Sequence, residues 1–122
     1  MLLRNKQSKI TIGIGTVLTI FVIMILAGSK NGSKDLSLLA RCLTEKGYIM
    51  YGADWCSYCQ KEKEAFGKSF TSINYVDCPK DPQKCLIAGV QKYPTWITPD
   101  GKKLEGKQGI ESLTKESGCL LQ

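Results

Sequence analysis

Two cysteines at the junction between an apolar strand and a helix constrain this chain more than any other feature. The apolar run 48–51 ends in a Gly-Ala-Asp bend, and Cys56 and Cys59 follow with two residues between them. Residues 60–66, Gln-Lys-Glu-Lys-Glu-Ala-Phe, then form a predicted helix. Cysteines at i and i+3 of a first helical turn have Cα atoms about 5–6 Å apart, within the disulfide range. The pattern predicts a pair that opens and closes as a disulfide.

The two sulfurs are predicted to take different roles. A helix N-terminus offers unpaired N–H groups and the positive end of the helix dipole, which stabilise a thiolate at Cys56. Cys59 lies one turn further into the helix, where we expect it to be buried. Cys56 is therefore the predicted nucleophile and Cys59 the resolving cysteine of a redox-active disulfide, a site that needs no separate cofactor.

A zinc site is the first alternative, because zinc knuckles also use Cys-x-x-Cys. Zinc would need a second pair of ligands, and Cys78 and Cys85 are the nearest candidates. Their spacing of six residues with two prolines suits an all-cysteine zinc site poorly. The sequence therefore favours redox chemistry without a metal, and an inert structural disulfide is the remaining alternative.

The chain contains six cysteines and no histidine. The missing histidine excludes Cys-His nucleophile pairs, histidine metal ligands and histidine general bases. Six cysteines in about 90 residues indicate disulfides and an oxidising compartment, with a reduced cytosolic protein as the alternative. We expect structural bridges Cys78–Cys85 and Cys42–Cys119, although spacing alone does not determine connectivity. A relay of electrons between one of these pairs and Cys56–Cys59 is the competing interpretation.

The N-terminal segment differs in composition from the rest. Residues 1–9 are basic and residues 10–27 carry no charge. Eighteen helical residues span about 27 Å, enough for the hydrocarbon core of a bilayer. We expect a transmembrane anchor there, with a cleaved signal peptide as the alternative. The polar Gly, Ser, Asn and Lys residues at 28–34 predict a linker. The basic flank predicts an inside N-terminus and therefore an extracytoplasmic domain over residues 35–122.

The charge balance gives no indication of a nucleic-acid partner. The whole chain carries +6, but three of its 17 Lys and Arg residues precede the apolar segment. The rest of the chain holds 14 basic and 11 acidic residues, which leaves only +3. No arginine cluster or aromatic-basic ladder accompanies this charge, so nucleic-acid binding is not predicted. Asp54, Lys61 and Lys63 are expected to be solvated.

The order of predicted elements gives an α/β chain of the α+β sandwich type. A βαβ half followed by a ββα half forms a four-stranded mixed sheet flanked by helices, which is the thioredoxin-like architecture. The elements are a helix capped by Asp35 and ending at Gly47, a strand at 48–51, a helix at 56–66, a strand at 73–77, a short helix ending near Gly89, strands at 93–98 and 103–106, and a helix at 110–117.

Tyr93-Pro94-Thr95 is the second predicted part of the site. A proline before a strand is ordinary, and alone it would mark only a strand start. In this fold, however, the position after the second strand and third helix is where a cis-proline loop faces the dithiol. We predict a cis Tyr93–Pro94 bond, with Tyr93, Pro94 and Thr95 binding client chains beside the apolar face of Trp55.

Together these segments resemble the thioredoxin-like domain fused to bacterial vitamin K epoxide reductase (VKOR) homologues. The resemblance rests on residues 50–66, 73–78 and 93–96, and covers roughly residues 36–119. In that family the domain takes electrons from substrate thiols and passes them to a quinone-linked membrane oxidase. The resemblance implies that Cys56 is the exposed nucleophile, that Cys59 resolves, that Pro94 is the cis-proline, and that the family's loop disulfide falls at Cys78 and Cys85.

Two departures qualify the resemblance. The four-helix VKOR part is not found in this sequence, so a separate oxidase is expected. Met50 stands where thioredoxin has a buried Asp, and Ser57-Tyr58 stands where strongly oxidising enzymes have Pro-His. We expect a potential between about −270 and about −120 mV.

These features predict a membrane-anchored extracytoplasmic thiol–disulfide oxidoreductase that promotes disulfide formation in client proteins with a VKOR-type oxidase. The alternatives are a reductase or isomerase of the same fold, and a non-catalytic binding module stabilised by zinc or disulfides.

Overall fold

The computed structural model describes residue 19 and residues 35–121. Apart from residue 19, the membrane segment expected at 10–27 and the linker expected at 28–34 lie outside the described residues. Within the part of the chain that is described, no helix is both long and apolar enough to cross a membrane. Residues 35–121 belong to one compact unit.

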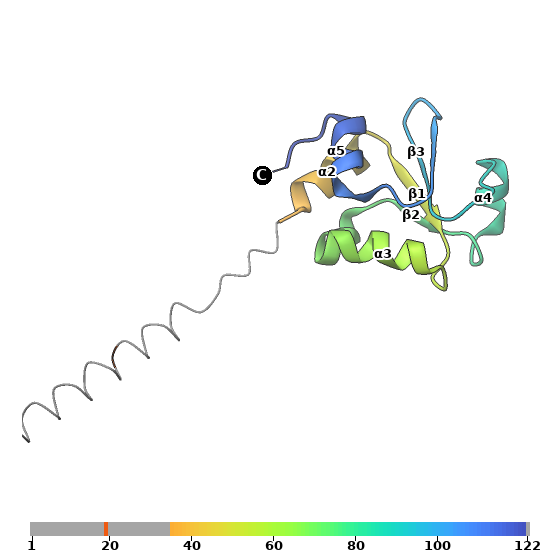
Figure 1. Cartoon of the computed structure of the whole chain (residues 1–122). Coiled ribbons are helices and arrows are strands. Elements are labelled where there is room, and N and C mark those ends of the chain that lie inside the picture. The colour runs from red at the N-terminus through yellow and green to blue at the C-terminus, as the bar shows by residue number, and fades with distance from the viewer. Residues whose placement is uncertain (1–18, 20–34, 122) are drawn as a thin grey trace, which may run out of the picture. The chain divides into compact units, whose positions relative to one another are not determined.

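A four-stranded sheet with the order β2-β1-β3-β4 lies at the centre of this unit (Figure 1). β1 (Ile49–Gly52) runs parallel to β2 (Tyr75–Asp77) and antiparallel to β3 (Thr95–Ile97), and β3 pairs antiparallel with β4 (Lys103–Glu105). The mixed four-stranded sheet predicted from the sequence is confirmed, and the protein is of the α+β class.

The helical segments of the described chain are α2 (Ser37–Glu45), α3 (Ser57–Phe66), the 3-10 segment η1 (Gly67–Ser72), α4 (Pro82–Ile87) and α5 (Gly109–Ser117). Successive strand residues point to opposite faces of the sheet, so β1 contributes to two clusters. Met50 joins the main core, which contains apolar residues of α2, α3 and α5. Tyr51 packs on the other face against Cys78 and Cys85, next to α4. Cys59 lies in the main core.

Two disulfides close the unit. Cys42 of α2 is joined to Cys119, which follows α5, with an S–S distance of 2.04 Å. Cys78 and Cys85 are joined at 2.06 Å across the turn that leads into α4. These are the two pairings expected from the sequence, and they leave Cys56 and Cys59 as free thiols.

Candidate functional site

Cys56 is the N-cap residue of α3. Its backbone is extended, with φ −77° and ψ 119°, and its Sγ accepts a hydrogen bond from the Cys59 N–H at 3.2 Å. The Cys56 N–H in turn donates to the Ala53 carbonyl at 3.1 Å, which forms the bend between β1 and the helix. An N-cap side chain must accept hydrogen bonds, and a thiolate accepts better than a thiol. The Cys56 sulfur therefore lies at the N-terminus of α3, with a backbone N–H directed at it.

Cys59 lies one turn further along α3 and is completely buried, whereas Cys56 keeps 9% of its surface exposed. Burial is the main cause that raises the pKa of the Cys59 thiol to about 12, and its interaction with Cys56 adds to the effect. In the reduced protein Cys59 is therefore a neutral thiol at ordinary pH. A residue that keeps some exposed surface, followed one turn later by a fully buried cysteine, is the arrangement that a nucleophile and a resolving thiol require.

Gly52, the last residue of β1, makes room for the Cys59 sulfur. A Cβ at this position would lie 2.8 Å from Cys59 Sγ and 3.3 Å from Cε2 of Tyr75. Gly52 does not need positive φ, so its lack of a side chain serves packing rather than backbone conformation. Sequence reasoning treated Gly52 only as part of a bend.

The proline loop lies next to the cysteine loop. The Tyr93–Pro94 bond is cis, and the ring of Tyr93 meets the ring of Trp55 edge-on, with centroids 6.2 Å apart. Trp55 is 73% exposed, whereas Pro94 and Thr95 are buried. The Thr95 hydroxyl donates to the Lys92 carbonyl at 2.7 Å. Of the predicted client-binding residues, the structure thus leaves the side chain of Trp55 the most accessible and turns that of Thr95 inward.

A hollow of about 660 Å³ opens beside these loops. Its lining comes from α3, the proline loop, the end of β4 and the turn that follows it. The lining residues are Tyr58, Lys92, Tyr93, Glu105, Gly106 and Lys107. Tyr58 is 60% exposed and forms an aromatic edge. Lys92 and Glu105 form an ion pair at 3.0 Å. The hollow is thus bordered by aromatic and charged groups.

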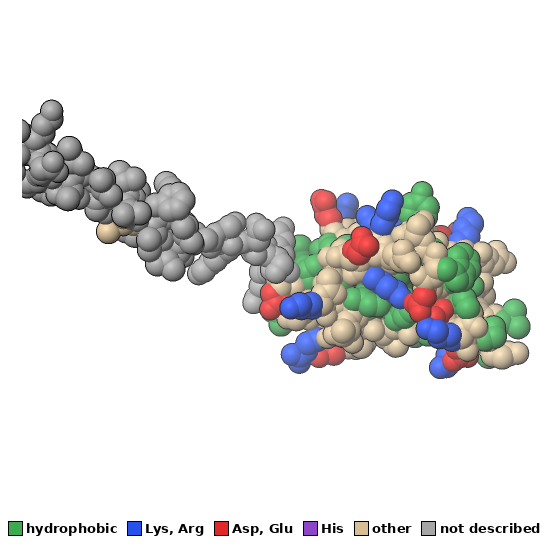
Figure 2. All heavy atoms as spheres, turned by 90° about the horizontal axis from the view of Figure 1, so that it is seen from below, with side chains coloured by type: hydrophobic (Ala, Val, Ile, Leu, Met, Phe, Trp, Pro, Cys, Tyr) green, Lys and Arg blue, Asp and Glu red, His purple; other side chains and the backbone are tan. Residues whose placement is uncertain are grey.

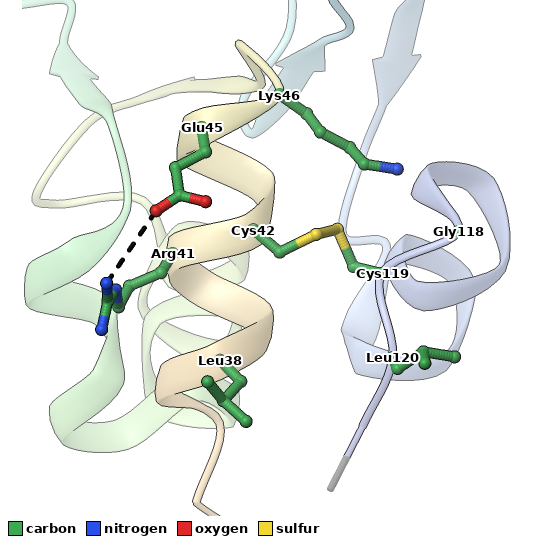
Figure 3. Close-up of a pocket in the computed structure, with 8 residues that line it drawn as sticks. All are labelled: Leu38, Arg41, Cys42, Glu45, Lys46, Gly118, Cys119 and Leu120. Atoms are coloured by element: carbon green, nitrogen blue, oxygen red, sulfur yellow. Dashed lines mark ion pairs between the residues drawn. A yellow bond between two sulfur atoms is a disulfide. The ribbon is translucent and has the colours of Figure 1, made fainter.

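A second hollow, of about 420 Å³, lies at the Cys42–Cys119 bridge (Figure 3). Figure 3 shows the bridge running from α2 to the segment after Gly118. Lys46 donates to the Ser117 carbonyl at 2.5 Å and fixes the end of α5. Neither Cys56 nor Cys59 lines this hollow. Its residues hold the two ends of the unit together.

Asp54 is at the centre of a charged cluster that sequence reasoning treated as solvated. Its carboxylate accepts from Lys63 at 2.7 Å and from Lys80 at 2.7 Å. These hydrogen bonds, with that of Lys63 first, hold the pKa of Asp54 well below its usual range. Lys80 also pairs with Asp77 at 2.9 Å, and Lys63 lies 3.9 Å above the ring of Tyr75. The cluster connects the cysteine loop, α3 and β2.

Glu62 is a buried charged residue that was not predicted. It has no exposed surface, and its carboxylate accepts from the backbone N–H groups of Gln108 at 2.7 Å and Gly109 at 2.9 Å. Burial is the main cause that raises its pKa, and the two hydrogen bonds act in the opposite direction. Glu62 thus attaches the cysteine helix to the start of α5. Its spacing of three residues from Cys59, on the buried face, was the available signal.

The described residues contain no cluster of three or more His, Cys, Asp or Glu side chains placed to hold a metal ion. No protein-family model matches the chain. The chain is similar to the thiol-disulfide oxidoreductase LTO1 of Arabidopsis thaliana, with 36% identity over 102 residues. That alignment covers 76% of this chain and 27% of the plant protein, so the chain spans about a quarter of its relative's length.

Proposed function

We propose that this chain is a thiol–disulfide oxidoreductase of thioredoxin-like fold that acts through Cys56 and Cys59. One observation carries the proposal: a free Cys56 caps α3 with its sulfur, and a free, fully buried Cys59 lies one turn behind it. The other four cysteines are already joined in two bridges. The similarity to a plant protein named for the same chemistry supports this proposal.

The exchange involves two disulfide steps. In the oxidised form a client thiolate attacks Cys56 Sγ, the Cys56–Cys59 bond breaks, and Cys59 leaves as a thiolate that takes up a proton. A second client thiolate then attacks the mixed disulfide and releases the Cys56 thiolate. The client loses two electrons and this protein gains them, so it returns to work only after reoxidation.

The hollow beside Tyr58 and Tyr93 is the proposed binding site for the client chain. Its aromatic edges, together with exposed Trp55, offer apolar contact close to Cys56. Buried Cys59 cannot be reached directly by a folded client. This supports a mixed disulfide between the client and Cys56, whether the client is being oxidised or reduced.

We further propose that the domain is held outside the cytoplasm by a membrane anchor at residues 10–27 and is reoxidised by a separate VKOR-type oxidase. The composition of that segment and the resemblance described above support this assignment.

On the face shown in Figure 2, side chains of both charge signs are interspersed with hydrophobic ones. The redox potential of the Cys56–Cys59 couple, measured with its redox state in cells, distinguishes this oxidising role from a reductase or isomerase.

Trapping of mixed disulfides tests the chemistry. In Cys59→Ala, Cys56 keeps its position, but no second thiol is present to break its mixed disulfide with a client. Clients should therefore accumulate as adducts that are visible on non-reducing gels and disappear on reduction. Cys56→Ala is the matched control, because the remaining Cys59 thiol is buried and traps nothing. If Cys59→Ala gives no adducts, and the purified chain contains stoichiometric zinc, the binding-module alternative replaces this proposal.

A further inference from the structure

The buried resolving thiol needs a source of stabilisation for its charge. During each exchange step Cys59 carries a transient thiolate, either as the attacking group or as the leaving group. Its site is apolar and closed, and Met50, its core neighbour in β1, offers no charge. A buried anion without a nearby positive charge is costly. A stabilising positive charge must therefore come from the elements around Cys59.

Lys63 is the cation that the fold places there. It lies four residues after Cys59 on α3, which puts the two side chains on the same face of the helix. Its side chain is only 26% exposed, and its ammonium is held on one side by Asp54 at 2.7 Å. On another side it rests on the Tyr75 ring at 3.9 Å. Both contacts restrict where the charge lies.

Tyr75 connects this ammonium with the Cys59 sulfur. The Tyr75 ring edge and Cys59 Sγ both border the space left by Gly52, at 3.3 Å and 2.8 Å from the position of a Cβ. The Lys63 ammonium therefore lies over the Tyr75 ring, and the Cys59 sulfur lies near the edge of the same ring. A hydrogen bond with the Ala53 backbone and, after it, the charge of Lys63 oppose the burial that raises the pKa of Cys59.

We propose that Lys63 is the positioning residue that stabilises the Cys59 thiolate during disulfide exchange, with Asp54 and Tyr75 fixing its ammonium. This inference rests on the proposed function. Other charged or titratable groups on the elements around Cys59 are Cys56 at the N-cap of α3, Glu62 on α3, Asp77 on β2 and Lys80 after it. Glu62 is engaged by the start of α5, and Asp77 and Lys80 pair with each other. Of the two lysines of α3, Lys63 is the one that lies one helical turn from Cys59 on the same face.

Lys63 should affect the rates at which the Cys56–Cys59 bond opens and closes, but not the redox equilibrium of this pair. Reduced Cys59 is protonated at pH 7, so the charge of Lys63 has little to stabilise in the resting reduced state or in the oxidised state. It acts on the transient thiolate alone. Loss of Lys63 should therefore slow release and formation of the Cys56–Cys59 bond by the same factor and leave the redox equilibrium unchanged.

The test uses the purified full chain, with Cys56 and Cys59 reduced and the other bridges intact, and the chromogenic disulfide dithiobisnitrobenzoate. Attack by Cys56 releases one thionitrobenzoate and leaves a mixed disulfide. Attack by Cys59 then closes the Cys56–Cys59 bond and releases the second. In Lys63→Met we expect an unchanged first phase and a second phase about tenfold slower, which reaches the wild-type rate about one pH unit higher. Lys63→Arg should restore most of the rate.

Lys61→Met is the matched control. Lys61 is on the same helix, carries the same charge and lies over the exposed Tyr58 ring at 5.5 Å, without an ion pair to any described residue. We expect its second phase to stay within about twofold of wild type. Equal second phases in Lys63→Met and Lys61→Met overturn the proposal. So does a Lys63→Met variant with a shifted glutathione equilibrium, which would show that Lys63 acts on the resting states rather than on the transient thiolate. A wild-type protein without any second phase would instead contradict the proposed function.

Discussion

Gly52→Ala is the substitution whose effect follows most directly from the packing of the site. The new methyl group would lie 2.8 Å from Cys59 Sγ, 3.5 Å from Cys59 Cβ and 3.3 Å from the Tyr75 ring. Ordinary contacts between such atoms are about 3.5–4.0 Å, so the sulfur must move by about 1 Å. Cys59 is short and fixed on a helix, and therefore the movement shifts α3 or forces another rotamer.

The magnitude is the difference between two opposed effects. Overpacking of a closed core costs about 1–3 kcal/mol. Replacing a strand glycine by alanine gains about 0.5–1 kcal/mol through the entropy of the unfolded chain. We expect a net loss of about 1–2 kcal/mol in the free energy of unfolding. For a domain of this size, that corresponds to a fall of about 5–10 °C in the thermal unfolding midpoint.

A double-mutant cycle identifies the cause. In a Cys59→Ala background the sulfur is gone, so Gly52→Ala should cost nothing or give a small gain, apart from the contact with Tyr75. Chemical denaturation of the four proteins, with the Cys42–Cys119 and Cys78–Cys85 bridges intact, gives the coupling energy. An equal cost in both backgrounds would refute the argument that Gly52 exists to accommodate the Cys59 sulfur.

Three other changes have predictable outcomes. Removing the Cys42–Cys119 bridge, with a sequence separation of 77, should cost about 4.5 kcal/mol, against about 2.5 for Cys78–Cys85 with a separation of 7, as measured by denaturation of the two double alanine variants. Because burial raises the pKa of Glu62, the folded chain keeps the Glu62 proton to a higher pH than the unfolded chain. The free energy of unfolding should therefore fall as the pH rises from the pKa of Glu62 in the unfolded chain to its pKa in the folded chain. Glu62→Gln should flatten that slope in denaturation series at different pH. Trp55→Ala should leave stability within about 0.5 kcal/mol but slow exchange with protein clients several-fold, without slowing a small disulfide.

Local sequence patterns were enough to predict most of the fold. The apolar run before the bend, the spacing of Cys56 and Cys59, and the proline at position 94 each act over a few residues, and the structure places β1, α3 and β3 at the corresponding positions. Boundaries were less accurate. The predicted cap Asp35 accepts from the Ser37 N–H at 2.9 Å, but the structure begins α2 at Ser37 with Leu36 as the N-cap residue. The 3-10 segment η1 was not predicted, because Gly67 was taken only as a helix end.

The environment of the sulfurs depends on contacts between elements far apart in the chain. Nothing local indicated that Lys63 would rest on Tyr75 of the neighbouring strand, or that Glu62 would bind the start of α5. Both residues lie in a run of alternating charges that is typical of a solvated helix face. Only the position of α3 against β2 and α5 shows which of these charges point inward. Sequence alone could identify the cysteines but not what tunes them.

Cys56 and Cys59 differ because the first depends on local contacts and the second on contacts between distant elements. The Cys56 sulfur accepts its hydrogen bond from the first turn of the helix that begins there, so this contact depends only on residues 56–59. Cys59 owes its burial to Gly52 and to the apolar core, and the charge that offsets this burial comes from Lys63, held by Asp54 and Tyr75. The reactivity of the first sulfur should therefore survive most distant substitutions. That of the second should respond to changes in β1, β2 and α3 alike, so substitutions there should alter the resolving step before they alter the attack at Cys56.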